Sequence, residues 1–291
     1  MSEDRSLNDL AFLKEEVKRL RQTLKEMTPG VDVLLRRRGF QIYRKEPADD
    51  LLLPSDEFLD DYYRIFRKYS FRLFLRDAIK HQESFTARKV ARYASPQVTR
   101  GYIAYLAGIG LAEKYRRGYR LVRRMKSFGQ TLEWYFAELL KREFGADAVW
   151  GAKFKRPDVG GDYDVVAKID GSILYAEVKS SPPKQIYDSE ISAFLDRVSD
   201  LRPEISIFFM DTELRMKDKI VPMFEEALRE RHRTPPVVLR IEKELFRIRD
   251  EIFIINAGDS IIRNIETVLK CYFDGGGNRK KAVRNAGRKP V

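Results

Sequence analysis

Residues 160–181, GGDYDVVAKIDGSILYAEVKSS, decide the fold of this chain. Two runs rich in β-branched and aromatic residues flank the pair Asp170-Gly171. An Asp-Gly pair between two such runs is the strongest short signal for a β-hairpin with a two-residue turn. The turn sets the register of the two strands, and Ile169 is predicted to pair with Ser172.

In this register four ionisable side chains share one face of the hairpin, because side chains alternate between the two faces of a strand. Asp164 is predicted to lie opposite Glu177, and Asp162 opposite Lys179. Directly opposed Cβ atoms are about 4.5–5.5 Å apart. Two carboxylates at that spacing repel each other unless a divalent cation joins them, and Lys179 adds a positive charge beside them.

The other face of the hairpin is entirely apolar, which predicts that it packs against a core. A half-buried pair of carboxylates is a candidate functional site. The competing interpretation is an exposed hairpin whose charges simply alternate across the strands. The apolar residues that form the predicted core face are Val165, Ala167, Ile169, Leu174, Ala176 and Val178.

Asp164, followed thirteen residues later by Glu177-Val178-Lys179, resembles the PD-(D/E)xK nuclease superfamily, and most closely its Holliday-junction-resolvase-like and restriction-endonuclease-like branch. The core of that family is helix, three strands, helix, strand. The sequence around the hairpin is similar in order over about residues 128–231. Its periodicity predicts a helix over 128–144, a strand over 149–154, a helix over 184–201 and a strand over 205–210.

The resemblance implies hydrolysis of phosphodiester bonds with Mg²⁺ or Mn²⁺ as the cofactor. Asp164 and Glu177 would bind the metal, helped by the backbone carbonyl of Val178. Lys179 would orient the attacking water or stabilise the charge that develops on the phosphate. Family members often add a glutamate from the first core helix, and Glu133 is the candidate here.

Three further side chains near this motif also have expected roles. Glu138 lies behind Glu133 on the same predicted helix and is the second choice for the additional carboxylate. Asp162 is expected to support the metal ligands from beside them. Arg197, on the helix over 184–201, is expected to lie in solvent, with a phosphate contact as the alternative.

Composition restricts the chemistry that the 291 residues can perform. One cysteine, Cys271, excludes an internal disulfide, and one cysteine with two distant histidines excludes a zinc finger. A Ser-His-Asp triad would need His81 or His232, and neither lies in a recognisable setting. Carboxylates, lysines and hydroxyls remain, and carboxylates bind hard cations such as Mg²⁺.

Positive charge is concentrated in one segment. The chain has a net charge of +12, but residues 62–127 alone contain 17 basic and 3 acidic residues, while residues 128–274 are net acidic. Such a concentration is typical of a module that binds a polyanion.

Residues 58–127 resemble a winged-helix domain. Helices are predicted over 58–80, 87–94 and 96–107, followed by strands over 111–115 and 119–123 around a turn at Arg117-Gly118. Ser95-Pro96 is a typical start for the third helix, which would enter the major groove of DNA. The expected base contacts on that helix are Gln97, Thr99, Arg100 and Tyr102. The expected phosphate contacts on the hairpin are Arg116, Arg117, Arg120, Arg123 and Arg124.

The rest of the chain completes the predicted organisation, an α/β (α+β) multidomain protein. Residues 1–30 form a coiled-coil-like helix whose apolar seam predicts either a homodimer through residues 7–27 or packing on its own domain. Residues 31–57 are expected to be a linker with a short strand pair. The winged helix (58–127) and nuclease core (128–234) precede a β/α extension (235–273) and a basic, disordered tail (274–291). No segment predicts a membrane span, and the cytoplasm is the expected location.

These observations predict a Mg²⁺-dependent DNA endonuclease whose winged-helix domain binds the substrate. Two alternatives remain open. One is a winged-helix transcriptional regulator whose nuclease-like domain does not cut. The other is a nuclease that acts on RNA, which a recognition helix disfavours because the A-form major groove excludes helices.

Overall fold

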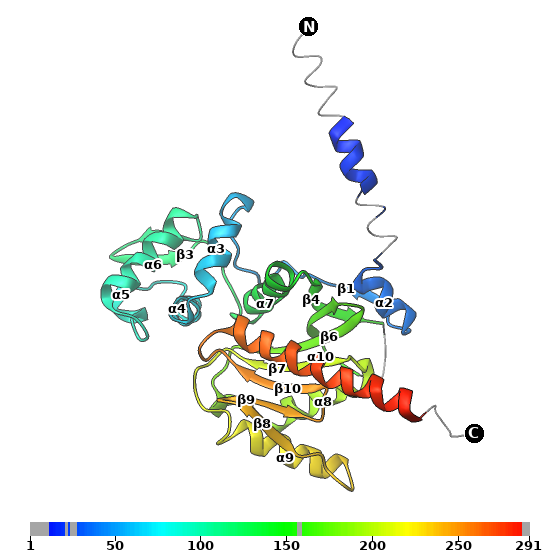
Figure 1. Cartoon of the computed structure of the whole chain (residues 1–291). Helices are drawn as coiled ribbons and strands as arrows, with labels where there is room; N and C mark the ends of the chain where they lie inside the picture. The colour runs from blue at the N-terminus through cyan, green and yellow to red at the C-terminus, as the bar shows by residue number, and fades with distance from the viewer. Residues whose placement is uncertain (1–11, 21–22, 24–27, 156–158, 287–291) are drawn as a thin grey trace, which may run out of the picture.

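The computed structural model describes residues 12–20, 23, 28–155 and 159–286. A mixed sheet of eight strands forms its centre, with helices on both faces (Figure 1). The parallel pairs are β6 with β7 and β7 with β10, and the other neighbours are antiparallel. In spatial order the strands are β1 (Ile42–Arg44), β4 (Asp147–Phe154), β5 (Tyr163–Ile169), β6 (Ser172–Lys179), β7 (Ile205–Met210), β10 (Ile252–Asn256), β9 (Leu245–Ile248) and β8 (Val238–Glu242).

Four long helices cover the sheet. On one face, α7 (Gly129–Phe144) and α10 (Ile261–Ala286) pack on the apolar side of the hairpin, as the alternation of the two strands predicts. On the other face, α8 (Asp188–Leu201) and α9 (Ile220–Arg231) cover Val166, Ile173 and Tyr175. Both faces of the hairpin are therefore buried, which excludes an exposed hairpin. The 3₁₀ turn η2 (Pro183–Gln185) and α8 replace the single helix expected over 184–201.

The hairpin has the predicted register. Ile169 pairs with Ser172 and Val165 with Ala176. The two turn residues, Asp170 and Gly171, have φ angles of 46° and 81°. Positive φ at both central positions is the geometry of a type I′ turn, which matches the right-handed twist of the strands. The element order α7, β4, β5, β6, α8, β7 is the predicted helix, three strands, helix, strand.

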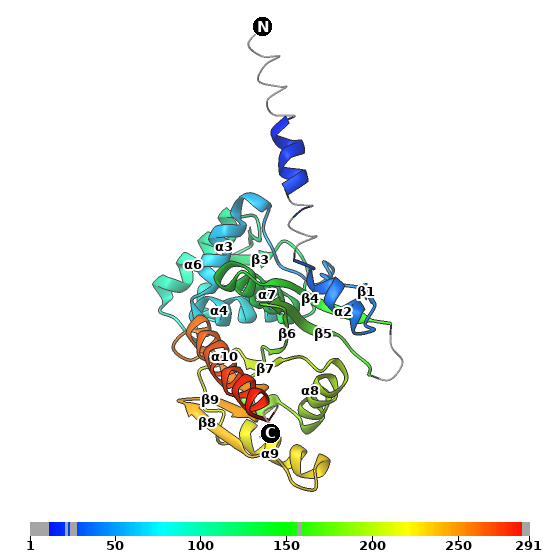
Figure 2. The same ribbon diagram turned by 45° about the vertical axis from the view of Figure 1, so that its right-hand side comes forward.

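Residues 56–121 form a smaller helical unit beside the sheet (Figures 1 and 2). Four α-helices and a 3₁₀ turn precede a two-stranded hairpin, so helices come before a hairpin as the sequence predicts. Its elements are η1 (Asp56–Phe58), α3 (Leu59–Phe66), α4 (Tyr69–Lys80), α5 (Ala87–Val90), α6 (Pro96–Gly108), β2 (Ala112–Tyr115) and β3 (Gly118–Leu121). The helix expected over 87–94 is thus shorter than predicted.

The single helix expected over 58–80 is interrupted at Arg67 and Lys68. Lys68 has an extended backbone and precedes the first residue of α4. A break leaves carbonyl groups at the end of α3 without their helical partners. The guanidinium of Arg72 donates to the carbonyls of Phe66 and Arg67 at 2.6 and 3.3 Å and replaces those partners.

The helical unit and the sheet share one continuous core. Phe66 of α3 lies 5.9 Å from Trp134 and 5.0 Å from Tyr135 of α7, measured between ring centroids. Arg72 of α4 forms an ion pair with Asp211, directly after β7, at 2.8 Å, and their side chains are 1% and 2% exposed. Breaking such a buried pair typically costs about 3–5 kcal/mol, because one charge is left uncompensated. The helical unit is therefore firmly docked on the sheet.

Segments outside the predicted core also join the sheet. Residues 31–57 contain a helix, α2 (Val31–Arg37), and only one strand, β1, which pairs with β4; the strand pair expected there was wrong. Strands β8 to β10 extend the same sheet, because β10 runs parallel to β7. The helix α10 continues to Ala286, so the structure describes residues 274–286 as helical where the sequence predicts a disordered tail.

The described residues 12–20 are helical and extend away from the rest of the molecule (Figures 1 and 2). Leu13, Val17 and Leu20 of the predicted seam are 45–57% exposed. Packing of this helix on its own domain was one of the two expectations, and these three residues do not pack in that way. Leu10, Leu24 and Met27, the other seam residues, lie outside the described residues. None of the helices within the described ranges is long and apolar enough to cross a membrane.

Candidate active site

The hairpin register brings Asp164 to the backbone of the facing strand. A carboxylate oxygen of Asp164 accepts a hydrogen bond from the N–H of Val178 at 2.8 Å. Burial raises the pKa of Asp164 well above its ordinary value, and the negative charges of Glu177 and Glu133 raise it further. The negative charges of Glu177 and Glu133 thus act on Asp164, and the sequence predicts the neighbourhood of Asp164 and Glu177.

Glu177 is the most enclosed of the three carboxylates, with 3% of the residue exposed. Its Oε1 atom forms an ion pair with the Nζ atom of Lys179 at 2.9 Å. Its Oε2 atom accepts hydrogen bonds from the hydroxyl of Tyr175 and from Nη1 of Arg197, the latter at 3.0 Å. Both oxygens of Glu177 are thus held by donors, two of which are cations.

Glu133 reaches the site from α7, as the resemblance implies for the additional glutamate. The pKa of Glu133 is raised to about 8. Burial is the largest cause, and the negative charges of Glu177 and Asp162 raise the pKa further, while the positive charge of Lys179 lowers it. A Cβ atom at Gly151 would lie 3.8 Å from the Glu133 carboxylate, which places this carboxylate beside strand β4. A carboxyl group that retains its proton near neutral pH is a candidate functional group.

Lys179 lies between acidic groups on two elements. Besides Glu177, its ammonium contacts Oε1 of Glu190 in α8 at 3.1 Å. Burial alone would lower the pKa of Lys179, but the charges of Glu177 and Asp164 outweigh it and raise the pKa. The lysine therefore stays protonated and is suited to stabilising negative charge on a phosphate.

Two expectations for the surrounding side chains were wrong. Asp162 does not face Lys179, since it forms an ion pair with Lys153 of β4 at 2.9 Å. The paired residues of the hairpin end at Val165 and Ala176, and strand β5 itself begins only at Tyr163, after Gly161 with its φ of +100°. Arg197 does not lie in solvent: its side chain is 12% exposed and contacts Glu177.

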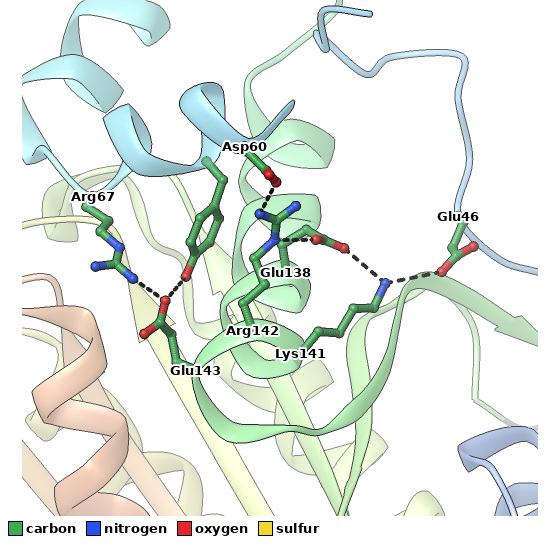
Figure 3. Close-up of polar contacts among 8 residues, drawn as sticks. Glu46, Asp60, Arg67, Glu138, Lys141, Arg142 and Glu143 are labelled. Carbon is green, nitrogen blue, oxygen red and sulfur yellow. Dashed lines mark hydrogen bonds and ion pairs between the residues drawn. The ribbon is translucent and has the colours of Figure 1, made fainter. Parts of the chain in front are cut away.

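Glu138 takes no part in the carboxylate cluster. It forms ion pairs with Lys141 at 3.1 Å and Arg142 at 2.9 Å, both on α7 (Figure 3). Arg142 also contacts Asp60 of α3, and Lys141 contacts Glu46 at 3.9 Å. Figure 3 thus shows a network that fastens α3 and the segment before it to α7. Glu138 is a structural residue, and Glu133 is the glutamate of this helix that faces the site.

The donor set suits a hard divalent cation. Asp164, Glu177 and Glu133 are oxygen ligands, and their mutual repulsion is of the kind that a bound cation relieves. Over the described ranges, no three His, Cys, Asp or Glu side chains are already arranged to hold a metal ion. Glu177 is paired with Lys179 and Arg197 instead, so binding of a cation would require these contacts to be shared.

The helix α6 presents only some of the side chains expected to contact bases. Gln97 and Arg100 are exposed. Thr99 is buried, and its hydroxyl donates to the carbonyl of Ser95 at 3.0 Å. Tyr102 is buried too, and its hydroxyl lies 2.8 Å from that of Ser70. The expectation that Thr99 and Tyr102 reach bases was wrong, because both lie on the core-facing side of α6.

The arginines of the β2–β3 hairpin differ in how they are held. Arg116 and Arg117 are exposed at the turn. Arg120 forms an ion pair with Glu113 at 2.7 Å, and the very exposed Arg124 contacts Glu83 at 3.6 Å. The guanidinium of Arg123 donates to three backbone carbonyls of residues 48–51, so the expectation that it faces phosphate was wrong.

Sequence reasoning missed Tyr175 and Glu190 and misplaced Arg197. A signal was present for Arg197, since it borders the apolar stripe of α8 beside Phe194 and Leu201, and both of these residues are buried. A charged residue within a core-facing stripe needs a buried partner. The identity of that partner, Glu177, depends on how α8 crosses the sheet.

Comparisons with known proteins find only distant likenesses. No protein-family model and no curated protein matches the chain. Can2 from Sulfobacillus thermosulfidooxidans, solved with cyclic tetra-adenylate, has a TM-score of 0.41 and 16% identity over 62% of this chain and 50% of its own. Protein VC1899 from Vibrio cholerae has a TM-score of 0.44 and 14% identity over 68% and 56%. The chain thus spans about half the length of these proteins. With both TM-scores below 0.5, neither likeness bears on function.

Proposed function

We propose that this chain is a Mg²⁺-dependent nuclease that hydrolyses phosphodiester bonds in DNA. The observation that supports this best is the Lys179–Glu177 ion pair at the end of the β5–β6 hairpin where Asp164 accepts from the N–H of Val178, with Glu133 near enough to raise the pKa of Asp164. Three carboxylates with a protonated lysine form a site that can gather a cation and stabilise an anionic transition state.

Asp164 and Glu177 would hold the metal, with the Val178 carbonyl and Glu133 as further oxygen ligands. A bound Mg²⁺ or Mn²⁺ supplies a Lewis acid and lowers the pKa of a bound water. The N–H of Val178 orients the Asp164 carboxylate, and Lys179 places a positive charge where a phosphate oxygen becomes more negative.

The test is a substrate panel with purified protein and Mg²⁺ or Mn²⁺. Linear duplex, plasmid, flapped and four-way-junction DNA are incubated beside the same panel with the Asp164→Ala variant. Cleavage of at least one substrate by the wild-type protein, and its loss in the variant, is expected. The proposal fails if all substrates stay intact, or if the variant cuts as well as the wild type.

We propose further that residues 58–127 act as a winged-helix module that binds DNA. This rests on the strong positive charge of the segment and on the exposure of Gln97 and Arg100 along α6 and of Arg116 and Arg117 at the hairpin turn. Arg117 has no hydrogen bond or ion pair to any other part of the chain that the structure describes, so it is free to meet a phosphate.

Replacing Arg117 by alanine is expected to weaken DNA binding about equally for all sequences and to lower the salt dependence of log K by about one phosphate contact. Replacing Arg100 should instead relax sequence preference. Fluorescence anisotropy at several salt concentrations measures both effects. Arg229→Ala on α9, where the arginine pairs with Glu226, is the matched control. Unchanged binding in both variants would rule out this surface.

The exposed seam of residues 12–20 supports a homodimer through residues 7–27, with a second copy of the chain as the partner. A seam of about two and a half heptads is short, so the association should depend on concentration. Sedimentation velocity of the full chain is expected to show a dimer that Val17→Asp abolishes. Phe12→Asp makes the same change from an exposed apolar side chain to a carboxylate outside the seam and should retain the dimer. A wild-type chain that stays monomeric at high micromolar concentration would contradict the proposal.

The pairing of both Glu177 oxygens favours a second candidate, a DNA-binding regulator whose nuclease-like domain does not cut. In that case Lys179 and Arg197 would neutralise the carboxylate permanently and take the place of the cation. Metal-independent binding to one DNA sequence, without cleavage in the substrate panel, would distinguish the regulator from the nuclease.

A further inference from the structure

Two charged side chains of α8 touch the proposed catalytic pair. Glu190 contacts the ammonium of Lys179 at 3.1 Å, and Lys179 contacts Oε1 of Glu177 at 2.9 Å. Oε2 of Glu177 in turn accepts a hydrogen bond from Arg197 at 3.0 Å. The four residues form a continuous chain of alternating charge. Glu190 and Arg197 are seven residues apart, which is two turns of a helix, so α8 holds both ends of this chain.

Arg197 occupies its position at a cost to stability. It lies at the edge of the apolar stripe of α8, beside Phe194 and Leu201, and its Nε atom is buried with no hydrogen-bond partner among the described residues. A buried donor without a partner destabilises a fold. The guanidinium also neutralises the buried carboxylate of Glu177, so this cost is accepted where the arginine can reach that carboxylate.

The backbone opposite α8 leaves room for this guanidinium. A Cβ atom on Gly161 would come within 2.5 Å of the Nη2 atom of Arg197. Gly161 also has a φ of +100°, which side chains other than glycine rarely adopt. The segment that leads into β5 is thus shaped so that Arg197 can reach Glu177.

The contacts of Glu177 divide between its two oxygens. Tyr175 and Arg197 both donate to Oε2, and neither contacts Oε1. Oε1 faces Lys179. Two donors on one oxygen restrict rotation of the carboxylate and keep the other oxygen directed toward the lysine. In the same way, Glu190 restricts the flexible side chain of Lys179.

We propose that Arg197 and Glu190 are positioning residues for the site. Arg197 holds Oε2 of Glu177, so Oε1 is the oxygen that a cation would share with Lys179, and Glu190 holds Lys179 against the site. The inference rests on the proposed nuclease function, because it assigns the same carboxylate and lysine to catalysis.

The Glu190→Gln variant tests the lysine end of the chain. Glutamine keeps the shape of the side chain and an oxygen that can accept from the N–H of Tyr187, as Glu190 does at 3.0 Å. Removing only the charge should lower the turnover number about tenfold, the lower end for residues that orient a metal site. The dissociation constant for Mn²⁺, measured without DNA, should stay within about twofold of wild type, because Glu190 is not a ligand. Glu226→Gln on α9, an exposed acid paired with Arg229, is the matched control.

The Arg197→Met variant tests the carboxylate end. Turnover should fall at least about tenfold, since Glu177 loses a donor that orients it. Mn²⁺ binding should stay equal or become tighter, because a cation that competes for Glu177 is removed. A folding defect would instead weaken both properties together. The inference is overturned if either variant keeps its turnover within about twofold of wild type, or if Arg197→Met weakens Mn²⁺ binding in step with turnover.

A double-mutant cycle separates this inference from the proposed function. The free energy of unfolding is measured without metal for Glu190→Gln, Lys179→Met and the double variant. The change in the double variant should differ from the sum of the two single changes, because the two side chains are in contact. Additive changes overturn the inference. A wild-type protein that cuts no DNA defeats the proposed function, while the cycle and the Mn²⁺ measurements still decide whether α8 positions the pair.

Discussion

Replacing Lys179 by methionine is expected to lower the turnover number for DNA cleavage at least about a hundredfold, a typical loss when a group that stabilises transition-state charge is removed. Methionine keeps the length of the side chain and removes only the ammonium. Lys179 is held between Glu177 and Glu190, and its raised pKa keeps it charged, so it presents a fixed cation to the phosphate. DNA binding should change little, because the proposed binding surface lies on the helical unit.

The measurement is a single-turnover cleavage assay at saturating Mg²⁺, with DNA affinity determined separately. Lys153→Met is the matched control, since Lys153 lies on the neighbouring strand β4 and pairs with Asp162. It should cut nearly as fast as the wild type. Equal turnover in both variants would remove Lys179 from the mechanism, and a loss of affinity without a loss of turnover would make it a DNA contact.

The affinity for Mg²⁺ is expected to rise steeply with pH up to about 8, because the pKa of Glu133 is raised to about 8. Burial is the main cause of that shift, and the charge of Glu177 is the next. Below this pH a metal ion can use Glu133 only after its proton leaves. For each proton that metal binding releases, the affinity for Mg²⁺ rises by up to about tenfold per pH unit. Between pH 6 and 8 the affinity should therefore increase by one to two orders of magnitude and then level off.

Isothermal titration calorimetry in buffers of different ionisation enthalpy measures both the affinity and the protons released. Glu133→Gln should bind more weakly at pH 8 and show a flatter dependence between pH 6 and 8, with Asp164 responsible for what remains. Glu138→Gln, on the same helix but paired with Lys141 and Arg142, is the matched control and should keep the wild-type profile. A flat profile in the wild type would contradict a protonated Glu133.

The same shift determines how pH affects the stability of the metal-free protein. Between the ordinary pKa of 4.5 and about 8, the folded state keeps a proton on Glu133 that the unfolded state releases. Stability falls with rising pH wherever the folded state binds more protons. This contribution is therefore fully present below pH 4.5 and is lost as the pH rises toward 8. Bound Mg²⁺ would offset the loss.

The sequence was most informative where structure depends on near neighbours. Asp170-Gly171 predicts its own turn, because few other pairs adopt positive φ at both positions, and the turn then sets the pairing of Ile169 with Ser172. The approach of Asp164 to strand β6 follows from the same register. Glu133 was predicted through the resemblance to a nuclease family, and the structure brings it close to Glu177 and Asp162.

Errors occurred where a side chain is controlled by a distant segment. The register alone placed Asp162 opposite Lys179, but the backbone turns at Gly161 and Asp162 contacts Lys153 instead. Tyr102 lies where a base contact is predicted on α6. Its hydroxyl instead forms a hydrogen bond with the hydroxyl of Ser70, which is thirty-two residues away in the sequence. Arg123 was predicted to contact phosphate, but its guanidinium donates hydrogen bonds to backbone carbonyls of residues 48–51. Local patterns do not contain these partners.

What the sequence determined by itself was the β5–β6 hairpin, the order of elements around it and the charge of residues 62–127. These depend on turn chemistry, on alternation along a strand and on composition, which act over a few residues or need no geometry at all. Only the tertiary structure decided that α8 brings Glu190 and Arg197 to Lys179 and Glu177. Those contacts depend on the angle and distance at which a helix crosses a sheet, and these are set by the packing of the whole core.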